Sequence, residues 1–198
     1  FGFESMFMHC WRLRERVLDL FEKTTGGRVI LSVVKVGGVV RDIDASQMAE
    51  IVSVLDGIKG EYTQIMNTLL TDTSVGVGHI TTEDAAALSM VGPFARASNL
   101  PYDVRSFGRG AYGDLADFAP ITATEGDCYA RVKVRCLEVL QSIEIIKELG
   151  AKIPAGDIEV AVKGAPADGA QASNVLEQPR GECYYYARGN GSKNLERM

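Results

Sequence analysis

The chain has 198 residues, a size typical of one domain, and its 46% hydrophobic and 24% charged residues are typical of a folded protein. A formal net charge of −5 without a dense Lys/Arg cluster argues against nucleic-acid binding. The longest apolar runs fall far short of the ~18 residues that a membrane span needs, and no signal peptide is recognisable.

The four cysteines are spread along the chain without a C-x-x-C pair: Cys10, Cys128, Cys136 and Cys183. Zinc and iron–sulfur sites use closer pairs, so we predict no metal or other cofactor within this chain. Scattered, reduced thiols favour a cytoplasmic protein. Because the chain begins at Phe1 rather than Met, we expect it to be an internal fragment of a longer subunit.

The first half of the chain predicts two long helices with an extended segment between them. Apolar residues recur with helical spacing over residues 4–23, and Gly26 follows as a stop signal. Residues 28–36 are rich in Val and Ile and predict a strand. Asp44 then begins a capping box for a second helix, which reaches about residue 70.

The second half begins with a short helix capped by Thr81 and reaching about residue 90. Residues 91–123 contain three prolines and several glycines and predict an irregular segment, which at this length is often functional. Thr124, together with Asp127, is predicted to cap a long helix over about residues 125–149.

Residues 155–173 are small and polar, without periodicity, and predict a flexible loop. Residues 181–187 predict a strand that enters a tight turn at 189–191. The fold class is therefore mainly α with small β-elements (α+β), built on an antiparallel helical bundle. We predict a single domain over residues 1–198.

Four short stretches, in this order and spacing, resemble the large-subunit family that group 4 [NiFe]-hydrogenases share with the quinone-side subunit of respiratory complex I. The resemblance covers nearly the whole chain. The stretches are Phe7–Arg12 with Gly37–Asp42, Gly92–Ser98 with Pro101–Arg105, Gly126–Arg131 with Arg135 and Glu138, and Glu177–Glu182 with Gly189–Ser192.

The resemblance implies a helical core and redox chemistry at a buried site that faces an iron–sulfur small subunit. In hydrogenases of the family, two C-x-x-C pairs hold a nickel–iron centre, and this chain contains neither pair. In complex I relatives the same cavity receives a quinone headgroup without a metal.

The resemblance also assigns a catalytic role to Arg180, which matches an arginine above the metal in hydrogenases, next to Pro179. A guanidinium is always charged and donates hydrogen bonds in a fixed fork, and proline restricts the backbone beside it. Complex I relatives commonly carry lysine at this position, so Arg180 favours the hydrogenase branch. The alternative is that Arg180 only anchors a hairpin through a salt bridge.

Asp127, Arg131, Arg135 and Glu138 recur at helical spacing and place four charges near one helix face. We predict a buried charge network, as in family members; a solvated face is the alternative. Arg96, Asp103 and Arg105 lie in the irregular segment, where arginines suit contacts to a neighbouring subunit or to a carboxylate. The resemblance implies that this loop lies on the side of the small subunit and the active site. Solubility of an exposed loop is the alternative for these residues.

The leading hypothesis is a catalytic large-subunit fragment of a membrane-linked hydrogenase that couples ferredoxin oxidation to H₂ formation, inactive by itself. The first alternative is a metal-free, quinone-binding subunit of an NADH:quinone oxidoreductase, and the second is a non-catalytic docking or assembly protein. The expected partners are an iron–sulfur small subunit and other subunits of the complex. We expect the protein at the inner face of the cytoplasmic membrane, held there by its partners.

Overall fold

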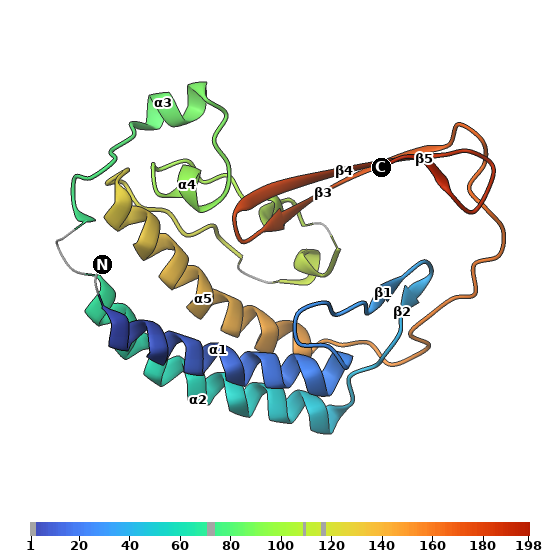
Figure 1. Cartoon of the computed structure of the whole chain (residues 1–198), viewed down its shortest axis with the longest axis horizontal. Coiled ribbons are helices and arrows are strands. Elements are labelled where there is room, and N and C mark those ends of the chain that lie inside the picture. Colours follow the sequence, from blue (N-terminus) through green and yellow to red (C-terminus); the bar gives the residue numbers. More distant parts are fainter. Residues whose placement is uncertain (1–2, 71–73, 109, 116–117) are drawn as a thin grey trace. The chain divides into compact units, whose positions relative to one another are not determined.

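The structure is a computed structural model that describes residues 3–70, 74–108, 110–115 and 118–198. Internal packing divides the chain into two compact units, which are coloured along the sequence in Figure 1. Unit 1 comprises the described parts of Phe1–Thr73 and Val139–Val162, and unit 2 those of Ser74–Glu138 and Lys163–Met198. The single domain that the sequence suggests stays a prediction.

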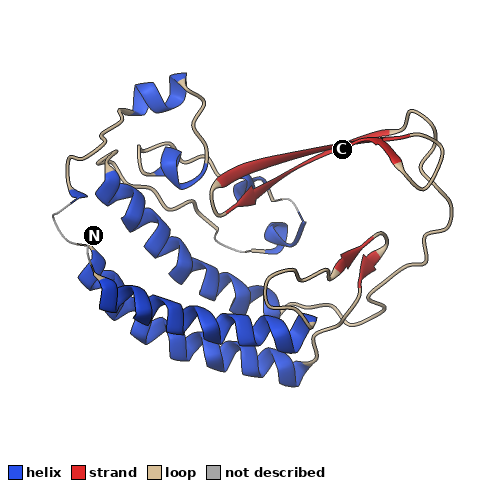
Figure 2. Cartoon of the chain, viewed as in Figure 1, coloured by secondary structure: helices blue, strands red, loops and turns tan. Residues whose placement is uncertain are grey.

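Two long helices dominate unit 1, as predicted. Helix α1 covers Glu4–Thr25 and helix α2 covers Ala45–Leu69 (Figure 2). Their apolar faces pack around a core of Leu13, Ile58 and Ile65. Helix α1 ends because Gly26 adopts a left-handed conformation with φ of 84°, which costs glycine little.

The start of α2 is fixed by the predicted capping box. The Asp44 carboxylate accepts a hydrogen bond from the Gln47 backbone N–H at 2.8 Å, and the Asp44 N–H donates to the Gln47 side chain at 3.0 Å. Farther along α2, a Cβ on Gly57 would lie 2.6 Å from Nη2 of Arg16. Glycine at this position therefore makes room for the Arg16 guanidinium, which binds Glu61 at 3.0 Å.

The strand predicted over residues 28–36 is much shorter in the structure. Only Val34–Lys35 forms strand β1, which pairs with β2, Gly38–Val39. The physical reason is Ser32, whose φ of 47° interrupts the extended chain. Gly37 adopts a φ of 95° in the turn between the two strands and accepts a hydrogen bond from Val160 at 2.8 Å.

The irregular segment predicted over residues 91–123 contains several short helices and much of the core of unit 2. Pro93 stands in the first turn of α4, and residues from Gly92 to Ser98 are largely buried. Ala97, Ala123, Ala130 and Val134 form a small apolar cluster. The short helices of unit 2 are α3 (Thr82–Ala87), α4 (Gly92–Arg96), η2 (Val104–Phe107) and η3 (Gly110–Asp114).

Helix α5 covers Cys128–Gly150 and begins three residues later than predicted. Gly126 precedes it with φ of 65°, which is not a helical conformation. Asp127 acts as the cap because its carboxylate accepts a hydrogen bond from the Ala130 N–H at 2.8 Å. The prediction was wrong in giving Thr124 a share of this role.

The C-terminal part of unit 2 forms a three-stranded antiparallel sheet in the order β3-β4-β5. The predicted strand is confirmed as β4, Gly181–Gly189, which pairs with β5, Leu195–Arg197. The connection between them covers residues 190–194 and is longer than the tight turn predicted at 189–191. Strand β3, Gln171–Gln178, was not predicted, and it takes in the last residues of the expected loop. Most of the preceding residues 155–170 are exposed.

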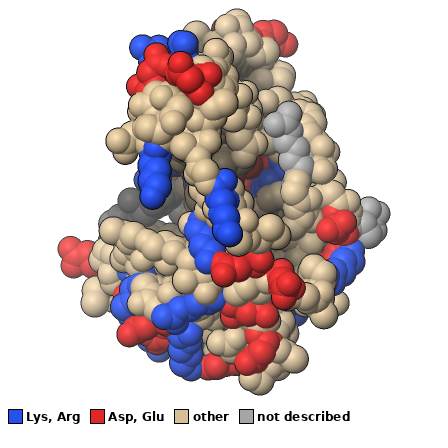
Figure 3. Space-filling view, turned by 90° about the vertical axis from the view of Figure 1, so that its right-hand side faces the viewer, with Lys and Arg blue, Asp and Glu red and all other residues tan. Residues whose placement is uncertain are grey.

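The observed helices and small antiparallel sheets confirm the predicted α+β class. Among the helices of the described residues, none is long and apolar enough to cross a membrane. Figure 3 shows acidic and basic side chains lying beside one another on the face turned to the viewer.

Candidate functional site

The candidate site centres on the turn between strands β3 and β4. The last strand pair joins Gln178 to Gly181, so Pro179 and Arg180 alone make the turn. Arg180 is exposed, and its guanidinium has no hydrogen bond or ion pair with another residue that the structure describes. The anchoring salt bridge considered as an alternative role is therefore not formed with the described residues.

The backbone of this turn lies against the start of helix α4. A Cβ on Gly92 would lie 2.4 Å from the Cα of Gly181 and 2.5 Å from the carbonyl oxygen of Arg180. Gly92 also has a φ of 69°, which glycine adopts without steric cost. Glycine at position 92 thus permits a backbone contact between two of the stretches that carry the family resemblance.

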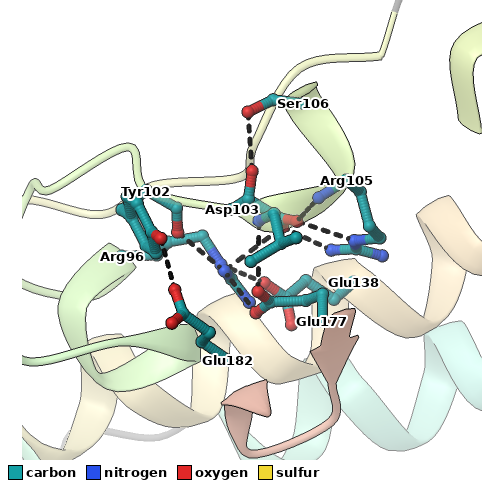
Figure 4. A network of polar contacts seen from close by, with 9 residues as sticks. Arg96, Tyr102, Asp103, Arg105, Ser106, Glu138, Glu177 and Glu182 are labelled. Atoms are coloured by element: carbon teal, nitrogen blue, oxygen red, sulfur yellow. Dashed lines mark hydrogen bonds and ion pairs between the residues drawn. The ribbon is translucent and has the colours of Figure 1, made fainter. Parts of the chain in front are cut away.

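A buried arginine lies close to the turn. Arg96 is 1% exposed, and its guanidinium binds Glu138 at 2.7 Å, Glu177 at 2.9 Å and Asp103 at 3.2 Å (Figure 4). It also donates to the carbonyl oxygen of Tyr102 at 2.9 Å. Arg96 therefore joins α4, α5, strand β3 and the segment before η2 at one point.

Asp103 connects Arg96 to a second arginine. It is fully buried and accepts two parallel hydrogen bonds from Arg105, Nε to Oδ1 at 2.9 Å and Nη2 to Oδ2 at 2.6 Å. Burial alone lowers the pKa of Arg105, but the hydrogen bond to Asp103 and the charges of Asp103 and Glu138 outweigh it, so the pKa is raised. The three sequence-predicted residues Arg96, Asp103 and Arg105 are thus brought together, and the carboxylates they contact belong to this chain.

Two glutamates beside the turn attach the hairpin to the same segment. Glu177, whose side chain is 3% exposed, also accepts a hydrogen bond from the Val104 N–H at 3.2 Å, and Glu182 accepts one from the Tyr102 hydroxyl. Sequence reasoning gave the side chains of Glu177, Glu182 and Tyr102 no role. The available signal was a glutamate on each side of Pro179-Arg180, at positions that face one another across a two-residue turn.

Asp127 and Arg131 are buried, but they bind backbone groups. Asp127 accepts from the Gly76 N–H at 2.7 Å, and Arg131 donates to the carbonyl oxygen of Gly78 at 2.7 Å and lies over the ring of Phe94 at 4.5 Å. Burial raises the pKa of Asp127, but hydrogen bonds from the Ala130, Gly76 and Asp127 backbone, with the Arg131 charge, lower it overall.

The predicted row of four buried charges therefore divides. Arg135 is exposed and donates to the Arg131 carbonyl oxygen at 3.1 Å, which corrects the expectation that it is buried. Glu138 is directed to Arg96 instead. The reason is distance along the helix, because at 1.5 Å per residue Glu138 lies about 10 Å beyond Arg131 on nearly the same face of α5. Asp127 and Arg131 therefore contact the loop at the helix start, while Glu138 reaches Arg96 of α4.

Within the described part of the chain, no three histidine, cysteine, aspartate or glutamate side chains converge to hold a metal ion. All four cysteines are free thiols.

Comparisons with known proteins give one consistent family. Residues 1–169 match the family described as respiratory-chain NADH dehydrogenase, 49 Kd subunit. An F(420)H(2) dehydrogenase subunit of Methanosarcina mazei is 34% identical over the full chain and 56% of its own length. The carbon monoxide-induced hydrogenase of Rhodospirillum rubrum is 32% identical, and the match covers 100% of this chain and 56% of the hydrogenase.

Two further comparisons extend this result. An NADH-quinone oxidoreductase subunit of Phocaeicola vulgatus is 35% identical over the full chain and 39% of its own length. A chain of the membrane-bound sulfane sulfur reductase, an archaeal respiratory membrane complex, superposes with a TM-score of 0.90 at 26% identity, covering 99% of this chain and 56% of that one. The chain spans about half the length of the relatives it matches.

Proposed function

Since the chain belongs to the family of the 49 kDa subunit of respiratory-chain NADH dehydrogenase, we propose that the whole protein is the large subunit of a membrane-linked [NiFe]-hydrogenase complex. Relatives in the family are named as oxidoreductase subunits, among them a hydrogenase and NADH-quinone oxidoreductases. In the proposed complex, electrons from ferredoxin reduce protons to H₂, and this chain contributes Arg180 and the scaffold that holds it.

The observation that carries the proposal is the state of Arg180. It stands at the tip of a two-residue turn, restricted by Pro179 and by the contact of Gly181 with Gly92. Its guanidinium is exposed and makes no ion pair with the described residues, whereas Arg96 and Arg105 are held by carboxylates. An arginine that is fixed in the backbone but free at its side chain is suited to act on a group outside this chain.

In the proposed role, the Arg180 N–H groups donate to negative charge that develops at the reacting ligand. A guanidinium stays protonated at every accessible pH, so it stabilises that charge as a fixed cation. A nickel–iron centre, if held by cysteines elsewhere in the whole protein, would supply the cleavage and formation of H₂. The residues of this chain position the cation and supply no metal ligand.

The second candidate function is a metal-free, quinone-binding subunit, which the NADH-quinone oxidoreductase relatives favour. There Arg180 would donate hydrogen bonds to a quinone oxygen. The whole protein distinguishes the two candidate functions. Two C-x-x-C pairs with stoichiometric nickel would support the hydrogenase, and a whole protein without these pairs and without nickel would support the quinone-binding role.

The partners are part of the same proposal. The structural neighbour belongs to a protein named as an archaeal respiratory membrane complex, and several relatives are named as oxidoreductase subunits. We therefore place an iron–sulfur small subunit against this protein, and the complex at the inner face of the cytoplasmic membrane.

The test is Arg180→Lys in the intact complex, with H₂ evolution driven by reduced methyl viologen. Lysine keeps the charge but loses the planar fork, so turnover should fall about 100-fold, a size typical of losing one preorganised donor. Nickel content should stay unchanged. The matched variant Arg197→Lys alters an exposed arginine on β5 and should keep full turnover. Unchanged turnover in Arg180→Lys would overturn the role of this residue.

A further inference from the structure

The contacts of the β3–β4 hairpin with α4 and with residues 102–104 are made at its Arg180 end, whereas at its other end β4 pairs with β5 and Gly189 packs against Pro166 and Ala167. Glu177, Gly181 and Glu182 each contact another element within three residues of the turn. At the other end of β3, residues 171–174 are exposed. Because a two-stranded hairpin alone is only marginally stable in water, contacts with other elements decide where its tip lies.

Both glutamates lie on one face of the hairpin. Glu177 and Glu182 are direct partners across the strands, so their side chains project from the same side. Figure 4 shows them reaching toward Arg96 and Tyr102, which belong to the segment that runs from α4 to η2. Glu177 binds Arg96 and the Val104 N–H, and Glu182 binds the Tyr102 hydroxyl.

Gly181 restrains the hairpin at a third point, through its backbone. The contact of Gly92 with Gly181 and the Arg180 carbonyl leaves no room for a side chain between them. Two side-chain contacts and one backbone contact therefore hold a turn of two residues. Buried ion pairs contribute little net stability because of their desolvation cost, so an ion pair beside the turn is better explained by the position it fixes.

We propose that Glu177, Glu182 and Tyr102 are positioning residues, which hold the Pro179–Arg180 turn so that the Arg180 guanidinium lies where it acts. This inference rests on the proposed function of Arg180. The Tyr102–Glu182 hydrogen bond is the part of the arrangement that a mild substitution removes, because Tyr102 is 37% exposed and its ring also packs edge-on against Phe107. Tyr102→Phe keeps that packing and removes the hydroxyl that donates to Glu182.

The experiment is a double-mutant cycle in the intact complex, with turnover in H₂ evolution driven by reduced methyl viologen. Tyr102→Phe should lower turnover about tenfold, since a misplacement of about 1 Å can cost up to 100-fold. In the Arg180→Lys background the same substitution should cause no further loss. Such non-additivity is expected only if the hydroxyl acts through Arg180.

Two controls separate positioning from folding. Tyr184→Phe removes the same hydroxyl from an exposed tyrosine of β4 and should leave turnover unchanged. The thermal midpoint and nickel content of Tyr102→Phe should equal those of the wild type. Glu182→Gln, whose amide oxygen still accepts the Tyr102 hydrogen bond, should retain more turnover than Glu182→Ala.

The outcomes distinguish this inference from the proposed function. Equal losses from Tyr102→Phe in both backgrounds, or no loss in the wild-type background, would overturn the positioning role while Arg180 keeps its own. Unchanged turnover in Arg180→Lys alone would remove the function of Arg180 and with it the reason for the three attachments.

Discussion

At the scale of single residues, Arg96 shows how this protein uses buried charge. Its guanidinium contacts three carboxylates, those of Asp103, Glu138 and Glu177. Arg105 neutralises part of this negative charge through Asp103. Two cations thus face three anions in a largely buried place, so the arrangement depends strongly on every member.

Replacing Arg96 by methionine should destabilise the chain by about 3–5 kcal/mol, because three carboxylates lose their shared cation inside the protein. Urea unfolding followed by circular dichroism measures this change. Arg12→Met removes an exposed partner of Glu61 and should change the free energy of unfolding little. Equal effects of the two substitutions would contradict the assigned importance of Arg96.

Asp127 predicts a dependence of stability on pH. Its pKa in the folded state is lowered, so the unfolded state takes up a proton more readily as the pH falls. Its contribution to stability is present above the ordinary Asp pKa of about 3.9 and is lost as the pH falls below that value. Asp127→Asn should lower the free energy of unfolding at pH 7. The free energy of unfolding of this variant should also fall less than that of the wild type as the pH is lowered.

Urea unfolding at a series of pH values checks this expectation. Asp168→Asn removes an exposed carboxylate and serves as the matched substitution. A pH profile of Asp127→Asn that runs parallel to that of the wild type through the acid range would contradict the role of Asp127.

At the scale of elements, the contact between α4 and the β3–β4 turn depends on glycine. Gly92 combines a left-handed conformation with a backbone neighbour 2.4 Å from the position of a Cβ. Gly76 has a similar φ of 73°, but no atom lies within 4 Å of its Cβ position. Comparing substitutions at the two glycines therefore separates the cost of the left-handed conformation from the cost of filling a close backbone contact.

Gly76→Ala should cost about 1–2 kcal/mol of stability, the usual penalty for a left-handed conformation. Gly92→Ala should cost about 1–3 kcal/mol more, because its methyl group displaces the turn. Thermal unfolding of the two variants measures the difference. In the complex, Gly92→Ala should also lower turnover, whereas Gly76→Ala should leave turnover unchanged. Equal losses of stability in the two variants would mean that the Pro179–Arg180 turn can move away from Gly92 without cost.

The same elements show what the sequence could predict. Local signals placed the helix ends well: Asp44 with Gln47 forms the expected capping box, and Gly26 ends α1 as expected. Strand β3 was missed because its exposed half carries small and polar residues without a periodic pattern. The Arg96 cluster could not be assembled from sequence, since its members lie up to 81 positions apart and no local pattern joins them.

At the scale of the whole molecule, two compact units share one chain, and an exposed segment leads from one unit into the other. Residues 155–162 belong to unit 1 and the residues from Lys163 onward to unit 2. Most of residues 155–170 are exposed. The predicted flexibility of residues 155–173 stays a prediction, and it is open to a direct test.

Limited digestion with trypsin should cut first after Lys163, because exposed segments of small and polar residues are the preferred sites of proteolysis. Mass spectrometry of the early fragments identifies the site. Lys193 provides an internal comparison, since it is also exposed but lies in the short connection between the paired strands β4 and β5. First cleavage after Lys193, with Lys163 resistant, would contradict the expected flexibility.

The register of the β3–β4 hairpin carries one more consequence. Side chains alternate between the two faces of a strand, so a single inserted or deleted residue within the turn would send Glu177 or Glu182 to the opposite face. Substitutions in the turn can be mild, but a change in its length would release the arginine from its support. The spacing between these glutamates is therefore expected to tolerate no length variation among proteins that use the arginine in this way.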